Sequence, residues 1–331
     1  MIIVVFFVFK GDREMRRKAL LFYILCALAL CCCFGARAEG LEPLPMDSFL
    51  PGPMPSEAAY LSPTEYQDDS IAVTIYQDRF ADTDYFFAHV LITHPSQLRT
   101  APAGMVGAPN ATFSYETENK ATQIAKAANA VIALNGDYYT KSDKCQVALR
   151  QTRQYRNFAN GTMDVLAIDM NGDLHVLQNC TKQGYKDYYE QMAGGLYNVF
   201  CFGPLLVQDG VSVIQESYKN TYIGSQNATQ RSAIAQLGPL EYMLVSTNGP
   251  QSQGNKGMTI YEFAQVCEAA GKRLSENGCM IAYNLDGGNS AAMIFRAVNP
   301  DNGRLVMKRV NSSDISERHL SDIIYFATLV K

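Results

Sequence analysis

Two glycine-containing turns place a carboxylate directly after an apolar segment. One is N-G-D at 135–137, which follows the apolar run 130–134, and the other is D-G-G-N-S at 286–290, which follows 280–285. Functional side chains concentrate on such loops because the strand fixes their position while the loop stays accessible. Glycine also lets backbone N–H groups approach an anion closely. Each of these strings is therefore either an ordinary turn or part of an anion-binding site with a carboxylate beside it, and the sequence leaves both open.

Arg231 stands at the start of the short apolar segment 232–235. An arginine in this position needs a partner, so it is either a buried salt-bridge residue or a ligand for an anion, and the sequence leaves both open. The dipeptide Asp209-Gly210 is different. It is flanked by apolar segments on both sides and is typical of a two-residue hairpin turn.

Several catalytic motifs are absent from the sequence. There is no G-x-S-x-G elbow, Walker loop, H-E-x-x-H or G-x-G-x-x-G. The chain has only four histidines, and no two cysteines after residue 38 have C-x-x-C spacing, so no zinc site is expected. An oxygen-ligated Ca²⁺ on the aspartate-rich turns stays open, and the metal ligands are unknown.

The amino-terminal segment 15–38 has the organisation of a secretory signal. A basic start at 16–18 precedes the apolar stretch 19–34, and A-R-A at 36–38 fits a cleavage site. We interpret residues 1–14 as a start-site artefact and expect a secreted or periplasmic protein, cut after Ala38, without a stable membrane span. Leu30 before Cys31 disfavours a lipid anchor, and the apolar stretch is shorter than the ~20 residues of a retained span.

Export changes the charge and the cysteine count. The whole chain has a formal charge of −4 and nine cysteines, and removal of residues 1–38 leaves −8 and five. An acidic chain argues against nucleic acid as a partner, because non-specific affinity comes from clustered Lys and Arg. In an oxidising compartment we expect the disulfides Cys267–Cys279 and Cys145–Cys180. The alternative is five buried free thiols.

The rest of the chain resolves into a linker and one domain. Residues 39–69 contain six prolines and are interpreted as a linker or surface strap, so the domain occupies 70–331. Two helices are expected, at 117–129 and from the T-x-x-E capping box at 259–262 to about residue 270. The expected strands are 71–77, 85–93, 130–134, 165–170, 174–178, 205–208, 211–214, 240–247, 280–285, 292–298, 305–310 and 323–330.

This inventory predicts the fold class. Many short strands joined as hairpins and few helices indicate an α+β fold: a single domain with a mixed, largely antiparallel sheet and a few packed helices. No repeat of solenoid period is present.

The ordered set of turns resembles the phosphodiester glycosidase family. The segments that carry the resemblance are N-G-D-Y-Y at 135–139, F-G-P-L-L-V-Q-D-G at 202–210, R-S-A-I at 231–234, N-G at 248–249 with G-M-T at 257–259, and L-D-G-G-N-S at 285–290. The resemblance covers about 71–330. Asn289 stands where the family has a third glycine, and Ala235-Gln236 replaces the glycine that commonly follows R-x-A-I.

The resemblance implies an exported hydrolase. It would cut a sugar 1-phosphodiester at the anomeric carbon and release free sugar, such as N-acetylglucosamine, and a phosphomonoester, with no cofactor required. Asp286 or Asp137 would serve as base or nucleophile, and Arg231 would hold the phosphate with the backbone N–H groups of the 286–290 turn. The residues expected to bind substrate are Asn135, Gly136, Gly203, Asn248, Gly287, Gly288, Asn289 and Ser290.

Two other functions stay open. A non-catalytic exported carbohydrate- or wall-binding protein on the same fold would use tyrosines for stacking, for example in a loop at 185–189, because the chain has no tryptophan. A metal-dependent phosphodiesterase would cleave the P–O bond instead. N-x-S/T sequons occur at Asn110, Asn160, Asn179, Asn227 and Asn311.

Overall fold

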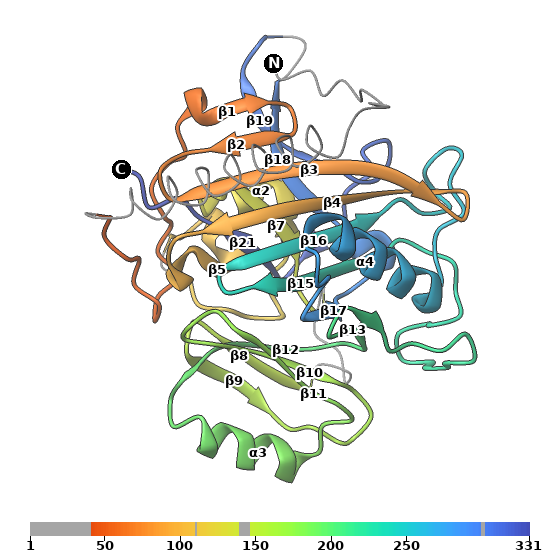
Figure 1. Ribbon diagram of the computed structural model, residues 1–331. Coiled ribbons are helices and arrows are strands. Elements are labelled where there is room, and N and C mark those ends of the chain that lie inside the picture. The colour runs from red at the N-terminus through yellow and green to blue at the C-terminus, as the bar shows by residue number, and fades with distance from the viewer. Residues whose placement is uncertain (1–40, 110, 139–145, 299–301) are drawn as a thin grey trace, which may run out of the picture. The chain divides into compact units, whose positions relative to one another are not determined.

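Most of the regular structure in the computed structural model is β (Figure 1). The structure describes residues 41–109, 111–138, 146–298 and 302–331. The expected signal segment, Cys145 and the Asn110 sequon lie outside them. Every strand pairing among the described residues is antiparallel, and the α+β fold class is confirmed, with three sheets of five or more strands in place of one.

The largest sheet has nine strands and carries the hairpins expected from the sequence. In spatial order its strands are β1 (Tyr60–Ser62), β2 (Glu65–Gln67), β3 (Ile71–Phe80), β4 (Thr83–Ile92), β16 (Glu241–Thr247), β15 (Ser232–Gly238), β17 (Ile281–Asn284), β13 (Leu205–Gln208) and β14 (Val211–Ser212). The β13–β14 turn has φ of 50° at Asp209 and 79° at Gly210. Positive φ at both central residues is the mark of the expected type I′ turn.

Two five-stranded sheets and one two-stranded sheet complete the fold. One five-stranded sheet, called the small sheet below, has the order β11 (Leu174–Leu177), β10 (Val165–Asp169), β12 (Leu196–Cys201), β8 (Val147–Arg150) and β9 (Arg153–Asn157). The other five-stranded sheet, called the β7 sheet below, has the order β19 (Leu305–Arg309), β18 (Met293–Val298), β7 (Ile132–Asn135), β21 (Asp322–Phe326) and β5 (Leu98–Pro102). Strands β20 (His319–Leu320) and β6 (Asn119–Lys120) pair with each other.

Side-chain alternation along the nine-stranded sheet feeds two different cores. On β15, Ala233 and Ala235 enter the core shared with α4 (Ile260–Leu274) and the small sheet, whereas Ile234 enters the core shared with the β7 sheet. This is the period-two pattern of a strand that is buried on both faces. A third core lies between the β7 sheet and α2 (Ala121–Ala127).

The helices agree with the sequence only in part. Helix α4 begins with the expected capping box, because the Thr259 hydroxyl accepts from the Glu262 N–H and the Glu262 carboxylate accepts from the Thr259 N–H. Helix α2 is shorter than expected, since Asn119 and Lys120 pair with β20 instead. Helix α3 (Lys182–Gln191), capped by the Thr181 hydroxyl, occupies the stretch that was expected to be a tyrosine-rich loop. The 3-10 turns are η1 (Glu57–Ala59), η2 (Pro95–Gln97), η3 (Ala103–Val106) and η4 (Gly288–Ser290).

The segment expected as a linker or strap contributes structure. Strand β2 pairs with Ala72–Thr74 of β3, and β1 pairs with β2, so the sheet begins ten residues before Ser70. The residues before them lie against the domain, where Arg99 is fully buried and donates to the carbonyls of Pro45, Ser48 and Leu50. Residues 45–50 therefore form a strap that supplies the acceptors of a buried cation.

The expected disulfides are not formed among the described residues. Cys180, Cys201, Cys267 and Cys279 are buried free thiols, which matches the alternative set out above for these four. The Cys267–Cys279 pairing is wrong: Cys279 Sγ lies 3.6 Å from the Cys267 carbonyl oxygen and acts as a weak donor to it. Cys180 is likewise unpaired, while its expected partner Cys145 is outside the description. No described helix is both long and apolar enough to cross a bilayer.

One sequon is closed by the fold. The Asn311 side chain is fully buried, its Oδ1 accepts from the Met293 N–H, and its Nδ2 donates to the carbonyls of Thr247 and Ala291. Both functions of the amide are thus used inside the protein, so the folded chain cannot present Asn311 to a glycosylating enzyme. The side chains of Asn160, Asn179 and Asn227 are exposed.

Candidate active site

The two acidic turns follow β7 and β17, strands of different sheets, and they meet in the fold. Asn135 Nδ2 donates to the Asp286 carbonyl at 2.8 Å, and the Asp286 N–H donates to the Gly136 carbonyl at 3.3 Å. Asn135 Oδ1 accepts from the Ala292 N–H at 3.1 Å. Asn135, expected to bind substrate, is buried and uses its amide to fasten one turn to the other.

A third predicted turn joins them at Gly203. The Asn284 side chain donates to the Gly203 carbonyl at 2.6 Å, and the Gly203 N–H donates to the Asn284 carbonyl at 3.1 Å. Gly203 has φ of 77°, and a Cβ there would lie 3.0 Å from Asp164 Cβ. The glycine thus serves the close approach of two backbone segments.

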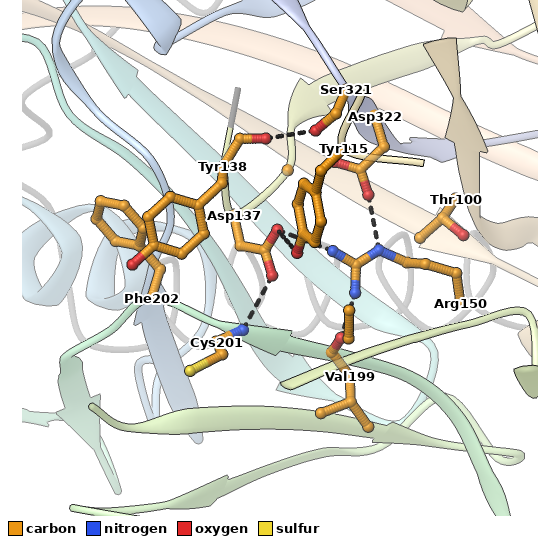
Figure 2. Close-up of polar contacts among 12 residues, drawn as sticks. Thr100, Tyr115, Asp137, Tyr138, Arg150, Val199, Cys201, Phe202, Ser321 and Asp322 are labelled. Carbon is orange, nitrogen blue, oxygen red and sulfur yellow. Dashed lines mark hydrogen bonds and ion pairs between the residues drawn. The ribbon is translucent and has the colours of Figure 1, made fainter. Parts of the chain in front are cut away.

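Asp137 is fully buried and fully paired (Figure 2). Its Oδ1 accepts from Arg150 Nη2 at 2.9 Å and from the Tyr115 hydroxyl at 3.1 Å. Its Oδ2 accepts from the Cys201 N–H at 3.1 Å. This carboxylate, expected as a base or nucleophile, acts as the polar centre that ties the turn after β7 to the small sheet.

Arg150 is the residue that the sequence analysis missed. Its Nε donates to Asp322 Oδ2 at 2.6 Å, so it links two carboxylates (Figure 2). The guanidinium lies 3.9 Å from the Phe200 ring centroid. The ion pair is fully buried. Although burial lowers the pKa of Arg150, the two carboxylates outweigh it and raise the pKa. Burial raises the pKa of Asp322.

Gly136 is required by the same ion pair. A Cβ on Gly136 would lie 2.0 Å from Asp322 Oδ1. Gly136 was expected to bind substrate, but its missing side chain leaves room for a buried carboxylate. The turn at 135–137 is thus built around Arg150 and Asp322, which lie 13 or more residues away along the chain.

Asp286 has a different environment. Its Oδ1 accepts from the Gly287 N–H at 2.9 Å, and its Oδ2 is covered but has no hydrogen-bond partner in the described part of the chain. Burial raises the pKa of Asp286 to about 7, against the opposing effects of the Ser290 hydroxyl, Arg318 and the Gly287 N–H. The negative charge of Asp137 raises it further. A carboxyl with this pKa exchanges a proton near neutral pH.

The glycines of the 286–290 turn do not form the expected N–H cradle. The Gly287 N–H is used by Asp286, and the Gly288 N–H donates to the Gln230 carbonyl at 2.8 Å. A Cβ on Gly287 would lie 2.7 Å from the same carbonyl oxygen, which explains the glycine. Asn289 Oδ1, by contrast, is buried and unpartnered among the described residues.

Arg231 lies behind this turn with its donors occupied. Its guanidinium donates to the carbonyls of Met258, Ile223, Gly224 and Asn227 at 2.7–3.3 Å. The side chain is buried, and burial lowers its pKa to about 10. Its hydrogen-bond partners in the described part of the chain are four backbone carbonyls, so a salt bridge to a carboxylate is not what holds it there.

A second arginine that the sequence analysis did not single out stands at the turn. Arg318 Nη1 donates to the Ser290 hydroxyl at 3.2 Å, and Arg318 is only partly buried. Its charge opposes the rise in the pKa of Asp286, which places it electrostatically close to that carboxylate. No motif surrounds Arg318, so only the fold reveals that it reaches the turn.

Asn248 lies on the loop after β16 and is tied to the rest through its neighbours. Its Oδ1 accepts from the Ser312 N–H at 2.5 Å, and Asn311 next to Ser312 donates to the Ala291 carbonyl. The described residues contain no group of three His, Cys, Asp or Glu side chains that could hold a metal ion, so they offer no support for a Ca²⁺ site.

Comparison with known proteins identifies the family of this chain. The family model of the phosphodiester glycosidases matches residues 128–327, which is more than half of the chain. The chain belongs to this family. The matched range contains all the predicted site residues as well as Arg150 and Arg318. No curated protein matches.

A solved structure shares the fold of this phosphodiester glycosidase family member. The catalytic domain of zebrafish N-acetylglucosamine-1-phosphodiester α-N-acetylglucosaminidase, auto-inhibited by its pro-peptide, is similar with a TM-score of 0.55 and 16% identity, over 78% of this chain and 84% of that one. A hypothetical protein from Synechocystis gives a TM-score of 0.49, with 14% identity over 80% and 64% of the two chains. An exported protein from Burkholderia pseudomallei gives 0.45, with 13% identity over 74% of each.

Proposed function

We propose that this protein hydrolyses a sugar 1-phosphodiester at the anomeric carbon. The observation that carries the proposal is the pair formed by Asp286, a carboxyl with one unpartnered oxygen and a pKa near 7, and the partly exposed Arg318 beside it. Family membership supports a hydrolase of this type.

The chemistry asks for little from a general acid. The bond between C1 and the phosphate oxygen breaks, water adds to C1, and the leaving group departs as a phosphomonoester, which is stable as an anion. The site must therefore bind a phosphate, stabilise an oxocarbenium-like transition state and supply an ionised carboxylate as base or nucleophile. Asp286 supplies the carboxylate, and it is ionised above pH 7.

The phosphate ligand in this proposal is Arg318 rather than Arg231. An arginine binds phosphate oxygens in a bidentate manner when its N–H groups can reach them. The Arg231 donors face four backbone carbonyls from within the protein, whereas Arg318 is partly exposed and its Nη1 reaches the Ser290 hydroxyl at 3.2 Å. Asn289, with its unpartnered Oδ1, is suited to accept from a sugar hydroxyl.

Asp137 has a positioning role in the same proposal. It is buried in the ion pair with Arg150, and its turn is fastened to the Asp286 backbone through Asn135. Burial is the main cause of the raised pKa of Asp286, and the negative charge of Asp137 adds to it. Asp137 thereby positions the reacting carboxylate and raises its proton affinity without touching the substrate.

The test is the Asp286→Asn variant with UDP-N-acetylglucosamine as substrate. Release of reducing sugar should fall by about 100-fold or more, because loss of a positioned acid–base group typically costs that much. Asp209→Asn in the β13–β14 turn is the matched control. It makes the same chemical change at a residue with φ of 50°, a value that asparagine adopts readily, and the variant should retain full turnover. Unchanged turnover by a folded Asp286→Asn protein would overturn the assignment.

We also infer that the chain is exported and cut after Ala38, from the basic start, the apolar stretch and the A-R-A site. Amino-terminal sequencing of the mature protein tests this. A mature chain that starts at Glu39 is expected, and one that retains residues 15–38 contradicts it.

A further inference from the structure

A cavity of about 670 Å³ lies between helix α3 and strand β9. It is lined by one stripe of the helix and by Gln154 and Asn157 of the strand. Strand β9 is the edge of the small sheet, and α3 runs beside it (Figure 1). The volume is within the ~300–1,000 Å³ typical of small-molecule sites. None of the candidate active-site residues lines this cavity.

Two tyrosines give the cavity an aromatic wall. Tyr185 is buried, and its hydroxyl donates to Gln154 Oε1 at 2.7 Å, which fixes the ring between helix and strand. Tyr189, one turn further, is 39% exposed, and the two ring centroids are 6.1 Å apart at an interplanar angle of 40°. This wall offers a ligand an apolar face, and binding costs little side-chain entropy because the Tyr185 ring is already held in place.

Two lysines stand on the same stripe. Lys182 and Lys186 are four residues apart, so they lie on one side of the helix. Lys182 has no ion pair within the described ranges, and Lys186 has only a loose one at 3.7 Å to Glu190, with both side chains more than 60% exposed. Exposed ion pairs of this kind contribute little to protein stability, so a ligand can replace them readily. Both charges are thus available to a ligand, in a chain whose net charge is −4.

Amide groups complete the lining. Gln183 Nε2 donates to Asp187 Oδ1 at 2.6 Å, which leaves Gln183 Oε1 as a free acceptor. The Asn157 side chain is exposed and has no hydrogen-bond partner in the described part of the structure. These groups can exchange hydrogen bonds with hydroxyls without first breaking any of their own.

We propose that the α3–β9 cavity binds an anionic saccharide. Aromatic faces stack on the C–H faces of sugar rings, amides match hydroxyls, and two adjacent ammonium groups match a carboxylate or phosphate on the sugar. An inorganic anion would contact the lysines but could not stack on the aromatic wall. A neutral sugar could stack on the wall but would leave the lysines without a counter-charge. An anionic saccharide can make all three kinds of contact. The site is independent of the proposed hydrolysis.

The test is calorimetric titration of the full mature protein with tetragalacturonate and with the neutral maltotetraose. The wild-type protein should bind tetragalacturonate at least about tenfold more tightly, since one charge-assisted hydrogen bond is worth about 1.5–3 kcal/mol and 1.4 kcal/mol is a factor of ten. Lys182→Ala/Lys186→Ala should lose that preference. Tyr189→Ala should weaken binding of both saccharides.

Two controls isolate the cavity. Lys219→Ala/Lys308→Ala removes the same charge from two exposed lysines elsewhere and should leave binding unchanged. Asp286→Asn should also bind normally, which separates this site from the proposed catalysis. Glucuronate and glucose 6-phosphate, titrated in parallel, distinguish a carboxylate from a phosphate requirement.

Three results would overturn the proposal. The first is the absence of any heat of binding at tetragalacturonate concentrations up to about 10 mM, ten times a dissociation constant of ~1 mM. The second is an unchanged affinity in Lys182→Ala/Lys186→Ala. The third is an equal affinity for tetraglutamate. The last would identify the cavity as a site for acidic peptide.

Discussion

The turns after β7 and β17 look alike in sequence and differ in how their aspartates are satisfied. Asp137 is fully buried and both of its oxygens accept hydrogen bonds, one of them from Arg150. Asp286 has one oxygen on the Gly287 N–H and one without a partner among the described residues. The first arrangement ties the turn after β7 to the small sheet, and the second fits the reacting carboxylate of the proposed function.

The comparison shows why one charge is placed beside the other. A buried carboxylate without compensation is costly, and the usual response is a raised pKa. Asp286 responds in this way, with a pKa near 7. Asp137 instead has an arginine partner, and its charge adds to the rise at Asp286. Burial is the main cause of the rise at Asp286, and the charge of the paired Asp137 contributes less.

The largest expected effect comes from breaking the satisfied turn. Arg150→Met removes the guanidinium and leaves the carboxylates of Asp137 and Asp322 buried and unpaired. Breaking a buried pair on one side typically costs 3–5 kcal/mol, so the free energy of unfolding should fall by about that amount. Urea denaturation followed by circular dichroism measures it.

The control for this change is Arg153→Met on the neighbouring strand β9. Arg153 is exposed, and surface substitutions usually change stability by no more than about 0.5 kcal/mol. If Arg150→Met were equally mild, Asp137 would not depend on its arginine, and the contrast between the two turns would fail.

The contrast itself was only half accessible from the sequence. That two acidic turns follow apolar strands was visible in local patterns, and so was the capping box at Thr259. Which aspartate would be paired was not visible, because the partners come from elsewhere in the chain: Arg150 stands in a short strand without any motif, and Asp322 is 185 residues after Asp137.

A smaller effect, of opposite sign, is expected from Asp286→Asn. The raised pKa means that the native protein binds more protons than the unfolded chain between about pH 4 and 7, so ionisation of Asp286 lowers stability as the pH rises through this window. An uncharged side chain avoids this loss. The variant should be more stable than wild type near pH 8, by up to about 4 kcal/mol.

The same denaturation experiment near pH 4 provides the comparison. There Asp286 is protonated in the native wild-type protein, and the gain should largely vanish. A gain in stability that does not depend on pH would mean that ionisation of Asp286 is not its cause.

The smallest effect sharpens the role of Arg318. Its positive charge lowers the pKa of Asp286, so Arg318→Gln should move the acid limb of the turnover–pH profile to higher pH. It should also raise KM for UDP-N-acetylglucosamine if Arg318 holds the phosphate. Arg304→Gln, at an exposed arginine just before β19, is the matched control and should change neither quantity.

Other features were missed for physical reasons that can be named. Strands β1 and β2 have only three residues each within a proline-rich stretch, so the composition suggested a linker although the edge of β3 gives them a partner. Helix α3 buries only one of its ten residues, Tyr185, and its three tyrosines suggested a loop, whereas the Thr181 cap and the packing of Tyr185 make it a helix.

The covered edge of β3 has a consequence for where the chain can be shortened. A protein that began at Ser70 would lack β1 and β2 and would leave the edge of β3 at Ala72–Thr74 without its partner. It would also lose the strap carbonyls that satisfy Arg99, leaving a buried cation without three of its acceptors. Unpaired strand edges can pair with other molecules. A chain shortened to Ser70 should therefore be less stable and more prone to aggregate than one that keeps the proline-rich segment.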